Sequence, residues 1–284
     1  MRSEGGQGLP FFVRILAAFF ARETLRVQPQ DPSNGCLQFF PLTVSSGLSC
    51  RPIFGHAHNL KTSEQILGTA LTLFNRHGEA SVTASDIALE LGISPGNLHY
   101  HFKGKETIHL ALFAQMQRDL VVLMGPVVQP PGLFDDDQDA SDIETTWFFL
   151  TVLMEKMLDY RYFYDSPRAL MVRFPDVERG FRRLLRMTHK SCNSLAARLV
   201  TGPDGAAHPR LAQLTDAMTM CLSCWLPYDS LLNPGDPDHV LVHRGVLQVL
   251  SHCAPYLGDE QRGFYAECEA LYQQMVEQSE SSLD

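Results

Sequence analysis

The sequence predicts an all-α protein, with an N-terminal three-helix helix-turn-helix domain and a C-terminal helical bundle. Apolar residues recur at helical spacing from about residue 62 to residue 278, and no segment of strand-type alternation competes with them. Glycine and proline residues divide this pattern into lengths typical of single helices. A tight glycine turn joins two of the first three helices, which is the layout of a helix-turn-helix unit.

Three regions are expected along the 284 residues. Residues 1–60 contain one apolar stretch followed by sequence rich in Pro, Ser and Gly, so we expect a disordered or loosely attached extension. An alternative is that translation begins at Leu60, which would make this region a mis-annotated extension. Residues 61–110 are predicted to form a helix-turn-helix DNA-binding domain, and residues 111–284 a helical ligand-binding and dimerisation domain.

Composition indicates a cytoplasmic protein. The seven cysteines are odd in number and irregularly spaced, which suits a reducing compartment better than a disulfide framework. No apolar run is long enough to cross a membrane, and the apolar stretch near the N-terminus lacks the flanks of a secretion signal. No phosphate loop, nucleophile elbow or His-Glu-x-x-His motif is present, so neither an enzyme nor a cofactor is expected.

The charge of the chain is unevenly distributed. The net charge is −9 overall, and residues 61–110 contain four basic and five acidic side chains. Residues 111–284 contain 14 basic and 24 acidic side chains. Because an acidic protein has little general attraction for DNA, binding must depend on a small and well-placed set of contacts.

The first helix is predicted to begin at Thr62, where Gln65 three residues later completes a capping box. Gly78 stands where a helix end favours a left-handed residue. The apolar face of this first helix is expected to comprise Ile66, Leu67, Ala70, Leu71 and Phe74.

The second and third helices carry clear boundary signals. Thr83 and Asp86 form a capping pair at the start of the second helix, which is expected to bury Ile87, Ala88 and Leu91. Gly92 supplies the positive φ of the turn, and Ile93 is expected to fill the space beneath it. Ser94 is expected to cap the third helix, with Pro95 in its first position.

The third helix is predicted to display one polar face. At about 100° per residue, Leu98 and Phe102 fall on the inner side, whereas Asn97, Tyr100 and His101 fall on the outer side. Asn can bond an adenine edge, and Tyr and His can bond phosphates or bases. The alternative is that Tyr100 and His101 only cover the edge of the domain.

The segment GISPGNLHYHFKGKETI resembles the recognition segment of the TetR (tetracycline-repressor) family of bacterial regulators, and TASDIALELG resembles the second helix of that family. The likeness spans about residues 62–112. Its motif is a glycine turn, a small capping residue, Leu, an aromatic/His pair, Phe, and a following Lys. It implies that bases of a double-stranded DNA operator are contacted by Ser85, Pro95, Gly96, Asn97, Tyr100 and His101.

The same resemblance assigns His99 and Lys105 to the phosphate backbone. His99 departs from the pattern, because the family usually has Tyr at this position. An imidazole carries charge only when protonated, so this contact would depend on pH. Lys105 is therefore the expected main anchor.

The remaining chain is predicted to be helical throughout. The fourth helix is expected to begin after Lys105 and to end near Gly125 and Pro126, before an acidic, Pro-rich connection whose spacing does not fit a calcium loop. The segment YRYFYDSPRALMVRFPDVERGFRRLLR resembles the effector domain of one TetR subgroup. Further helices are expected over residues 143–164, 167–173, 176–200, 208–231, 237–254 and 259–278.

Two groups of side chains in this part have a functional and a structural interpretation. The aromatic residues could enclose an apolar small-molecule effector or could simply be core; they are Trp147, Phe148, Phe149, Tyr160, Tyr162, Phe163, Tyr164, Trp225 and Tyr228. The second group could bind a metal or sense thiol oxidation, or could be small buried residues; it comprises His189, Cys192, Cys221, Cys224, His252 and Cys253.

The resemblance implies a homodimer formed by the C-terminal helices, with two DNA-reading helices spaced about 34–36 Å apart. The expected function is a ligand-responsive repressor in which an effector shifts the fourth helix. Two alternatives remain: an interaction protein that kept this fold but lost specific DNA binding, and a metal- or thiol-responsive regulator. No ligand-binding residue can be named from the sequence, and no metal ligand is expected.

Overall fold

The computed structural model describes residues 61–128, 141–165, 167–200 and 206–281. The regular secondary structure in these ranges is helical, which confirms the predicted all-α fold. The expected extension over residues 1–60 lies outside the described residues, as does residues 129–140 of the acidic connection. No helix in the described ranges has both the length and the apolar character required to cross a membrane.

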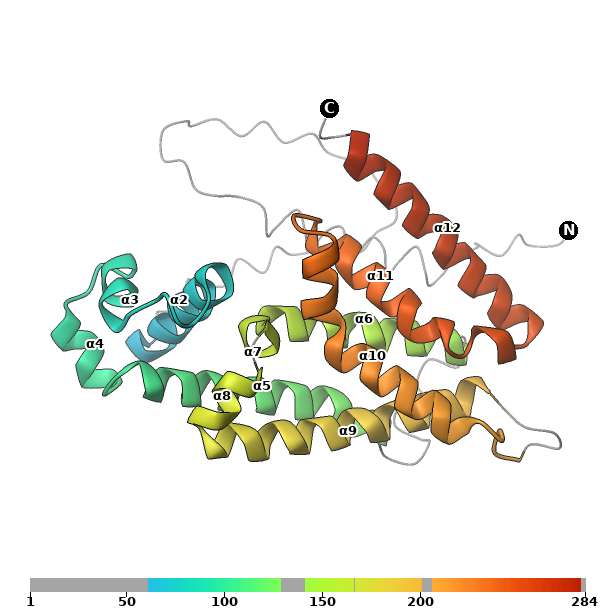
Figure 1. The fold of residues 1–284 in the computed structure, drawn as a ribbon, viewed down its shortest axis with the longest axis horizontal. Helices are drawn as coiled ribbons and strands as arrows, with labels where there is room; N and C mark the ends of the chain where they lie inside the picture. Colours follow the sequence, from blue (N-terminus) through green and yellow to red (C-terminus); the bar gives the residue numbers. More distant parts are fainter. Residues whose placement is uncertain (1–60, 129–140, 166, 201–205, 282–284) are drawn as a thin grey trace, which may run out of the picture. The chain divides into compact units, whose positions relative to one another are not determined.

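The first three helices pack against one another (Figure 1). They are α2 (Thr62–His77), α3 (Ala84–Glu90) and α4 (Pro95–His101). Ile66, Ala70 and Phe74 of α2 are fully buried, as is Ile87 of α3, and Leu98 of α4 is 3% exposed. We call these helices and their connections the three-helix domain. Its predicted inner face is confirmed at these positions.

Most of the predicted local signals are present. The Thr83 hydroxyl accepts a hydrogen bond from the Asp86 backbone N–H, and the Asp86 carboxylate accepts one from the Thr83 N–H at 2.8 Å. The Ser94 hydroxyl caps α4 by accepting a hydrogen bond from the Asn97 backbone N–H at 3.1 Å. Gly78 and Gly92 have φ values of 74° and 68°, the left-handed region in which a side chain would be strained.

The predicted start of the first helix was wrong in one detail. The residue that precedes the helix is Lys61, and its N–H donates to the Glu64 carboxylate at 3.2 Å. Thr62 is already helical, so the expected pairing of Thr62 with Gln65 does not form the cap. The sequence contains two overlapping x-x-x-Glu/Gln spacings here, and the carboxylate is the better acceptor for an N-terminal N–H.

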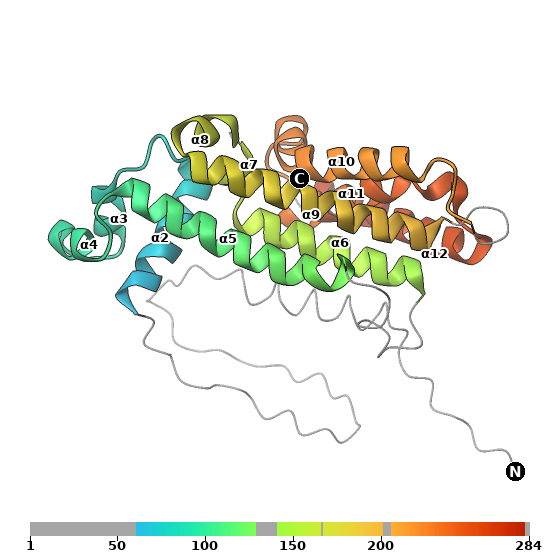
Figure 2. The same ribbon diagram turned by 90° about the horizontal axis from the view of Figure 1, so that it is seen from below.

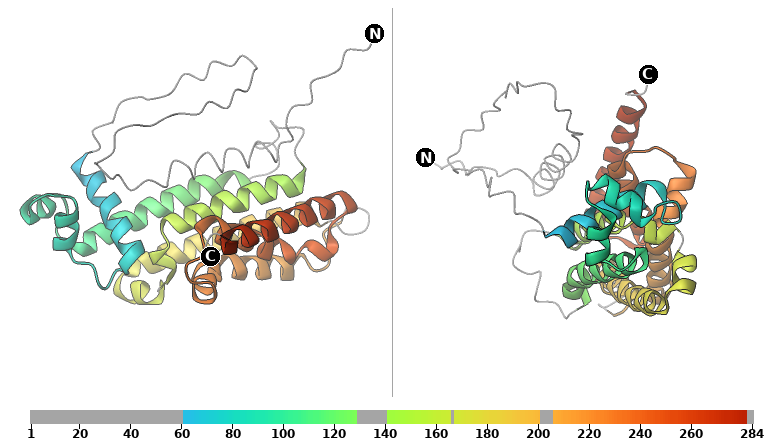
Figure 3. Two further views of the ribbon diagram at one scale, coloured as in Figure 1. Left: turned by 90° about the horizontal axis from the view of Figure 1, so that it is seen from above. Right: turned by 90° about the vertical axis from the view of Figure 1, so that its left-hand side faces the viewer.

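The remaining helices form the helical body. They are α5 (Lys105–Val128), α6 (Asp142–Asp159), α7 (Tyr162–Asp165), α8 (Pro167–Arg173), α9 (Pro175–Leu199), α10 (Leu211–Leu232), α11 (Asp238–Ser251), the short 3₁₀ helix η2 (Ala254–Tyr256) and α12 (Asp259–Ser281). Helices α5 and α9 lie side by side, and α9 also packs on α10 (Figure 2). Helix α11 packs against α6, α10 and α12, and α12 also contacts α6 (Figure 3).

The helix expected over residues 143–164 is divided in two. Helix α6 ends at Asp159, and α7 begins at Tyr162. The Asn75 side chain of α2 occupies this break: its amide donates to the Asp159 carbonyl at 2.9 Å and accepts from the Tyr162 N–H at 3.2 Å. A residue distant in the sequence therefore satisfies the free backbone groups at the ends of two helices. The break could not be predicted from the local sequence, because this sequence contains no Pro or Gly.

The fourth expected helix also passes through its predicted end. Helix α5 continues to Val128 with Pro126 inside it. Proline in this position removes the bond to the carbonyl of Val122, a residue that is 75% exposed and lies on the solvent side of the helix. Proline close to a helix end is therefore tolerated here.

Close helix packing holds the body together. Gly180 of α9 faces Phe113 of α5, and a Cβ at this position would lie 2.7 Å from Phe113 Cζ. A second fastening joins three helices, because Arg244 of α11 donates to the buried Asp229 of α10 at 2.6 Å and to the Tyr272 hydroxyl of α12 at 2.7 Å.

Candidate nucleic-acid interface and cavity

Seven of the eight predicted contact residues form an exposed surface on the three-helix domain. They are Ser85, Pro95, Gly96, Asn97, His99, Tyr100 and His101. Ser85 lies in the first turn of α3, and the others lie on α4. Because buried Leu98 fixes the rotation of α4, the polar side chains on both sides of it face outward.

Tyr100 is the largest exposed side chain on this surface. It is 78% exposed, and its ring meets the His101 ring edge-on at 5.2 Å between centroids. An exposed aromatic ring beside an imidazole and the Asn97 amide offers hydrogen-bond donors, acceptors and apolar area to a base edge or a phosphate. This chemistry suits a nucleic-acid groove better than the edge of a hydrophobic core.

The eighth predicted residue, Lys105, is committed to contacts inside the protein. Its ammonium donates to the backbone carbonyls of Glu79 and Val82 at 2.8 and 3.0 Å, and it lies 2.9 Å from Glu79 Oε1. An ammonium has three hydrogens, and these acceptors use all of them. Its side chain is 19% exposed. Lys105 therefore fastens the start of α5 to the loop between α2 and α3.

Sequence reasoning passed over a different cation. Lys103 lies in the connection between α4 and α5 and is exposed. The KGK motif places two lysines close to the end of α4, and either of them could contact a phosphate. The sequence does not reveal which of the two turns inward.

A polar junction connects the three-helix domain with the body. The Glu79 carboxylate lies between α2 and α3, and Nη1 of Arg173 from α8 reaches both of its oxygens at 3.1 Å. Nη2 of Arg173 bonds Glu106 of α5 at 3.3 Å. Burial opposes ionisation of Glu79, but the hydrogen bond and charge of Lys105, together with the charge of Arg173, outweigh it and lower the pKa of this carboxyl. Glu79 is therefore an anion shared between the two parts.

His109 forms the buried side of this junction. It is 1% exposed and stacked on Phe74, and its Nδ1 lies 3.3 Å from the Tyr162 hydroxyl. Its Nε2 lies 2.9 Å from Glu79 Oε1. Burial lowers the pKa of His109, which favours the neutral ring. A proton on Nε2, with Nδ1 accepting from Tyr162, fits both contacts.

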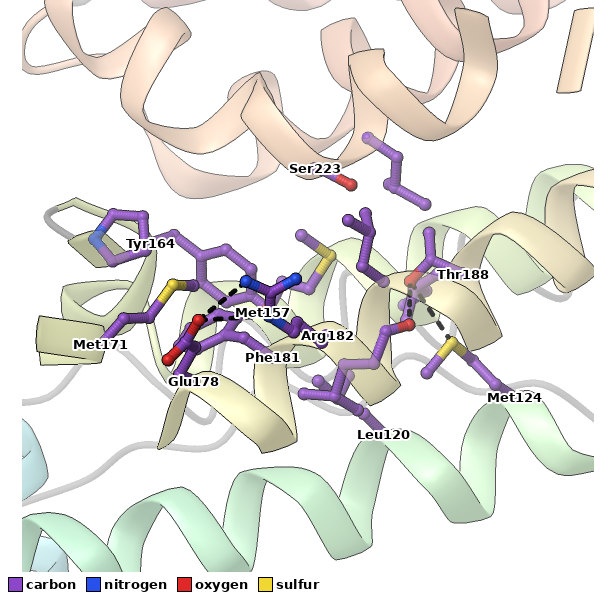
Figure 4. A pocket seen from close by; sticks show the side chains of 15 residues that line it. Leu120, Met124, Met157, Tyr164, Met171, Glu178, Phe181, Arg182, Thr188 and Ser223 are labelled. Carbon is purple, nitrogen blue, oxygen red and sulfur yellow. Dashed lines mark hydrogen bonds and ion pairs between the residues drawn. The ribbon is translucent and has the colours of Figure 1, made fainter. Parts of the chain in front are cut away.

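The helical body contains a partly open cavity of about 330 Å³ (Figure 4). This volume lies within the range of small-molecule sites. Its walls come from α5, α6, α8, α9 and α10, together with Tyr164 of α7. The apolar part of the wall is rich in thioether and leucine side chains and includes Leu120, Met124, Leu153, Met157, Met171, Phe181, Leu184 and Leu222.

A few polar groups interrupt this apolar wall. Glu178 and Arg182, one turn apart on α9, form an ion pair at 2.8 Å (Figure 4). Burial raises the pKa of Tyr164, whose hydroxyl forms no hydrogen bond with the residues that the structure describes. Methionine walls adapt to irregular apolar shapes, and such isolated polar groups orient a bound molecule.

The aromatic residues divide between core and surface. Tyr164 alone of the nine lines the cavity within the described part of the chain. Phe148 and Tyr228 are 47% and 56% exposed. The remaining six are buried core: Trp147, Phe149, Tyr160, Tyr162, Phe163 and Trp225. The cavity is therefore lined mainly by aliphatic and thioether side chains.

The cysteine and histidine pairs do not form a metal centre in the described ranges, where no three His, Cys, Asp or Glu side chains are arranged to hold an ion. Burial raises the pKa of Cys192 and Cys221 to about 11 and that of Cys253 to about 12. Thiols of this kind stay protonated near neutral pH and react slowly. Cys224 is exposed.

Two family models match the chain. One, described as "Bacterial regulatory proteins, tetR family", matches residues 66–112, and the other, described as "Bacterial transcriptional repressor" in the TetR group, matches residues 131–265. The first covers most of the three-helix domain and the start of α5, and the second covers most of the helical body.

Individual relatives agree with these models. A short segment is 44% identical over 48 residues to the protein named "Uncharacterized HTH-type transcriptional regulator YerO" of Bacillus subtilis (strain 168), and it spans 17% of each chain. A TetR-family regulator from Marinobacter aquaeolei VT8 is 23% identical, with a TM-score of 0.62 over 75% of this chain and 99% of its own. AmtR of Mycobacterium smegmatis is 19% identical, with a TM-score of 0.50 over 77% and 96%. At these identities the two structures establish likeness of fold alone.

Proposed function

The chain belongs to the TetR family of bacterial transcriptional regulators, and from this premise we propose that it is a cytoplasmic, ligand-responsive, homodimeric repressor. The proposed partners are a double-stranded DNA operator, a second copy of the chain and a small apolar effector. The family supports a non-enzymatic role. The observation that carries the proposal is the exposed polar surface of α4, held outward by buried Leu98.

DNA contacts are assigned from this surface. Pro95 and Gly96 allow close backbone approach at the tip of α4, and Asn97 can form two hydrogen bonds with an adenine edge. Tyr100 and His101 supply further donors to bases, and we assign a further contact to Ser85, which is exposed in the first turn of α3. We assign the phosphate contacts to His99 and to exposed Lys103. Lys105 takes the structural role described above.

A homodimer supplies the second DNA-reading helix. Helix α10 presents a row of exposed apolar side chains, with Met220 66%, Tyr228 56% and Leu231 83% exposed. Their spacing places them on one face of the helix. A face of this kind on the body is typical of an interface with a second copy, and two copies of α4 double the number of contacts with the operator.

The effector is proposed to occupy the cavity beside α9. Its apolar wall selects an apolar molecule, and the Tyr164 hydroxyl and the Glu178–Arg182 pair select for polar groups on that molecule. Nile red, an uncharged apolar dye, is a suitable probe. Ser223→Trp would fill the cavity and should abolish binding of the dye.

The DNA-binding function can be tested without knowing the operator. The full chain is used to select duplexes from a random pool, and affinity for the selected duplex is measured by fluorescence anisotropy at several salt concentrations. Asn97→Ala is expected to weaken binding about tenfold or more. Thr72→Ala, an exposed change on α2, serves as the matched control and should leave affinity unchanged.

Two outcomes would contradict the proposal. Failure to enrich any sequence would favour the alternative of an interaction protein that has lost specific DNA binding. A mass near 31.8 kDa by light scattering at micromolar concentration, instead of about twice that value, would exclude the stable dimer. Leu231→Asp is expected to convert the dimer to the monomer if α10 forms the interface.

A further inference from the structure

We propose that Arg173 is the residue through which occupancy of the cavity changes the orientation of the three-helix domain. The inference rests on the proposed ligand response and names the route by which that response reaches the DNA-reading helix. Arg173 is thus a positioning residue that acts through Glu79.

Helix α8 belongs to both the cavity and the junction. Pro167 and Met171 line the cavity, and Arg173 stands two residues beyond Met171 on the same seven-residue helix. The next helix, α9, begins at Pro175 and also lines the cavity. A ligand that displaces the backbone of α8 through its contacts with Pro167 and Met171 therefore also displaces Arg173, which lies on the same short helix.

The receiving group is a single carboxylate. Glu79 lies in the loop that connects α2 with α3, and it holds Arg173, Lys105 and His109 around its two oxygens. Lys105 and His109 both lie on α5, whereas Arg173 lies on α8. The carboxylate therefore connects the three-helix domain to two helices of the body. The relative strengths of its contacts with α5 and with α8 determine the position of the domain between these helices.

A second tie lies next to the first. The Asn75 side chain of α2 bridges the break between α6 and α7, and Tyr164 of α7 lines the cavity. The described residues between Asp159 and Arg173 thus contact α2 at one end and the Glu79 loop at the other, and Tyr164, Pro167 and Met171 among them line the cavity. Movement of this segment bears on the three-helix domain at two points.

The ion pair between Arg173 and Glu79 can break and form again readily. The Arg173 side chain is 45% exposed and also reaches exposed Glu106, so water and a second carboxylate can replace Glu79 as its partner. The Lys105 tie is less accessible, with side-chain exposures of 19% and 13% for the two partners. A partly exposed ion pair is weak and easily exchanged, whereas the Lys105 contacts persist. Glu79 is expected to remain with α5 in both states while α8 engages or releases it.

The test measures coupling rather than stability. Affinity of the full chain for its selected duplex is determined with and without saturating Nile red, and the ratio of the two dissociation constants is the coupling factor. Allosteric coupling between the cavity and the DNA-reading helix predicts a wild-type coupling factor of about fivefold or more. Arg173→Gln is expected to bring this factor below about twofold. Its affinity for the dye should not change.

The matched control is Arg168→Gln. Arg168 lies on the same helix, is exposed, and forms no ion pair with any residue of the described ranges. It carries the same change of charge, so it should retain the wild-type coupling factor. Hydrogen exchange of peptides from residues 62–101 is a second readout: the dye should alter exchange in the wild type and in Arg168→Gln, but not in Arg173→Gln.

The outcomes separate the two levels of the argument. If the wild-type chain binds selected DNA and the dye with a coupling factor above fivefold, and Arg173→Gln retains that factor, the route through Arg173 is wrong while the ligand-responsive function stands. If the wild-type factor is one, or if the dye does not bind, the ligand response itself is overturned and the inference falls with it. Loss of coupling in both variants would also overturn the assignment to Arg173.

Discussion

The two lysines that follow α4 should have different roles, one in stability and the other in DNA binding. Replacing each of them by methionine distinguishes these roles. Met keeps an unbranched apolar stem of similar length and removes the ammonium. Lys105→Met deletes three donor contacts to Glu79 and Val82. Lys103→Met deletes an exposed charge for which we propose a phosphate contact.

For Lys105→Met, the free energy of unfolding should fall by about 2 kcal/mol. Hydrogen bonds to charged groups contribute about 1.5–3 kcal/mol. The lower half of that range applies, because Arg173 still pairs with Glu79 and the Lys105 side chain is 19% exposed. For a unit of this size, the melting temperature should decrease by about 4–8 °C.

For Lys103→Met, the free energy of unfolding should change by less than about 0.5 kcal/mol, as for other exposed positions. Affinity for every duplex should fall by a similar factor. The slope of log K against log salt concentration should become shallower by about one for each DNA-reading helix, because one phosphate contact is lost.

Urea unfolding and salt-dependent anisotropy on the same preparations decide between these roles. The reasoning would be refuted if Lys105→Met kept wild-type stability and reduced the salt slope, since Lys105 would then contact phosphate. A loss of stability in Lys103→Met with an unchanged salt slope would refute the assignment of Lys103.

Three further changes have defined outcomes. His99→Tyr should raise operator affinity about threefold, because a phenol donates a hydrogen bond at any pH near neutrality; unchanged or weaker binding by anisotropy would remove His99 from the phosphate contacts. Gly180→Ala should lower the free energy of unfolding by about 1–3 kcal/mol in urea titrations, because the added Cβ overlaps the Phe113 ring despite the better helix propensity of Ala; a more stable variant would show that the packing there is loose. Burial and nearby His239 lower the pKa of His243 to about 4, so the unfolded chain binds the proton first as pH falls below about 6.5, and stability should fall by about 2 kcal/mol between pH 7 and pH 5; His243→Phe should reduce that difference, and an equal difference in both chains would assign the effect to other groups.

Local features of the three-helix domain could be predicted from the sequence because they depend on neighbouring residues. The Thr83–Asp86 and Ser94 caps and the positive φ of Gly78 and Gly92 each follow from interactions within a few positions. The outward orientation of α4 follows from the single inward Leu98. The exposure of the seven predicted contact residues could therefore be predicted without reference to the packing of the helical body.

Features that depend on distant residues could not be predicted. The break between α6 and α7 is satisfied by Asn75, which is more than eighty residues away in the sequence. The inward position of Lys105 depends on the Glu79 and Val82 carbonyls, which no motif identifies. The cavity combines side chains from six helices, so it could not be separated from ordinary core by composition.

These internal contacts also change the electrostatic account of DNA binding. Residues 61–110 contain four basic and five acidic side chains, and the pairing of Lys105 with Glu79 removes one of each from the surface. Lys103 is then the cation adjoining α4 that we assign to phosphate, so each three-helix domain neutralises few phosphates by lysine or arginine. Operator affinity must come mainly from uncharged donors on α4 and from two copies bound together, and the salt dependence of binding should therefore be shallow. A steep dependence, comparable to that of a protein with six or more phosphate contacts, would mean that charge from another part of the chain takes part in binding.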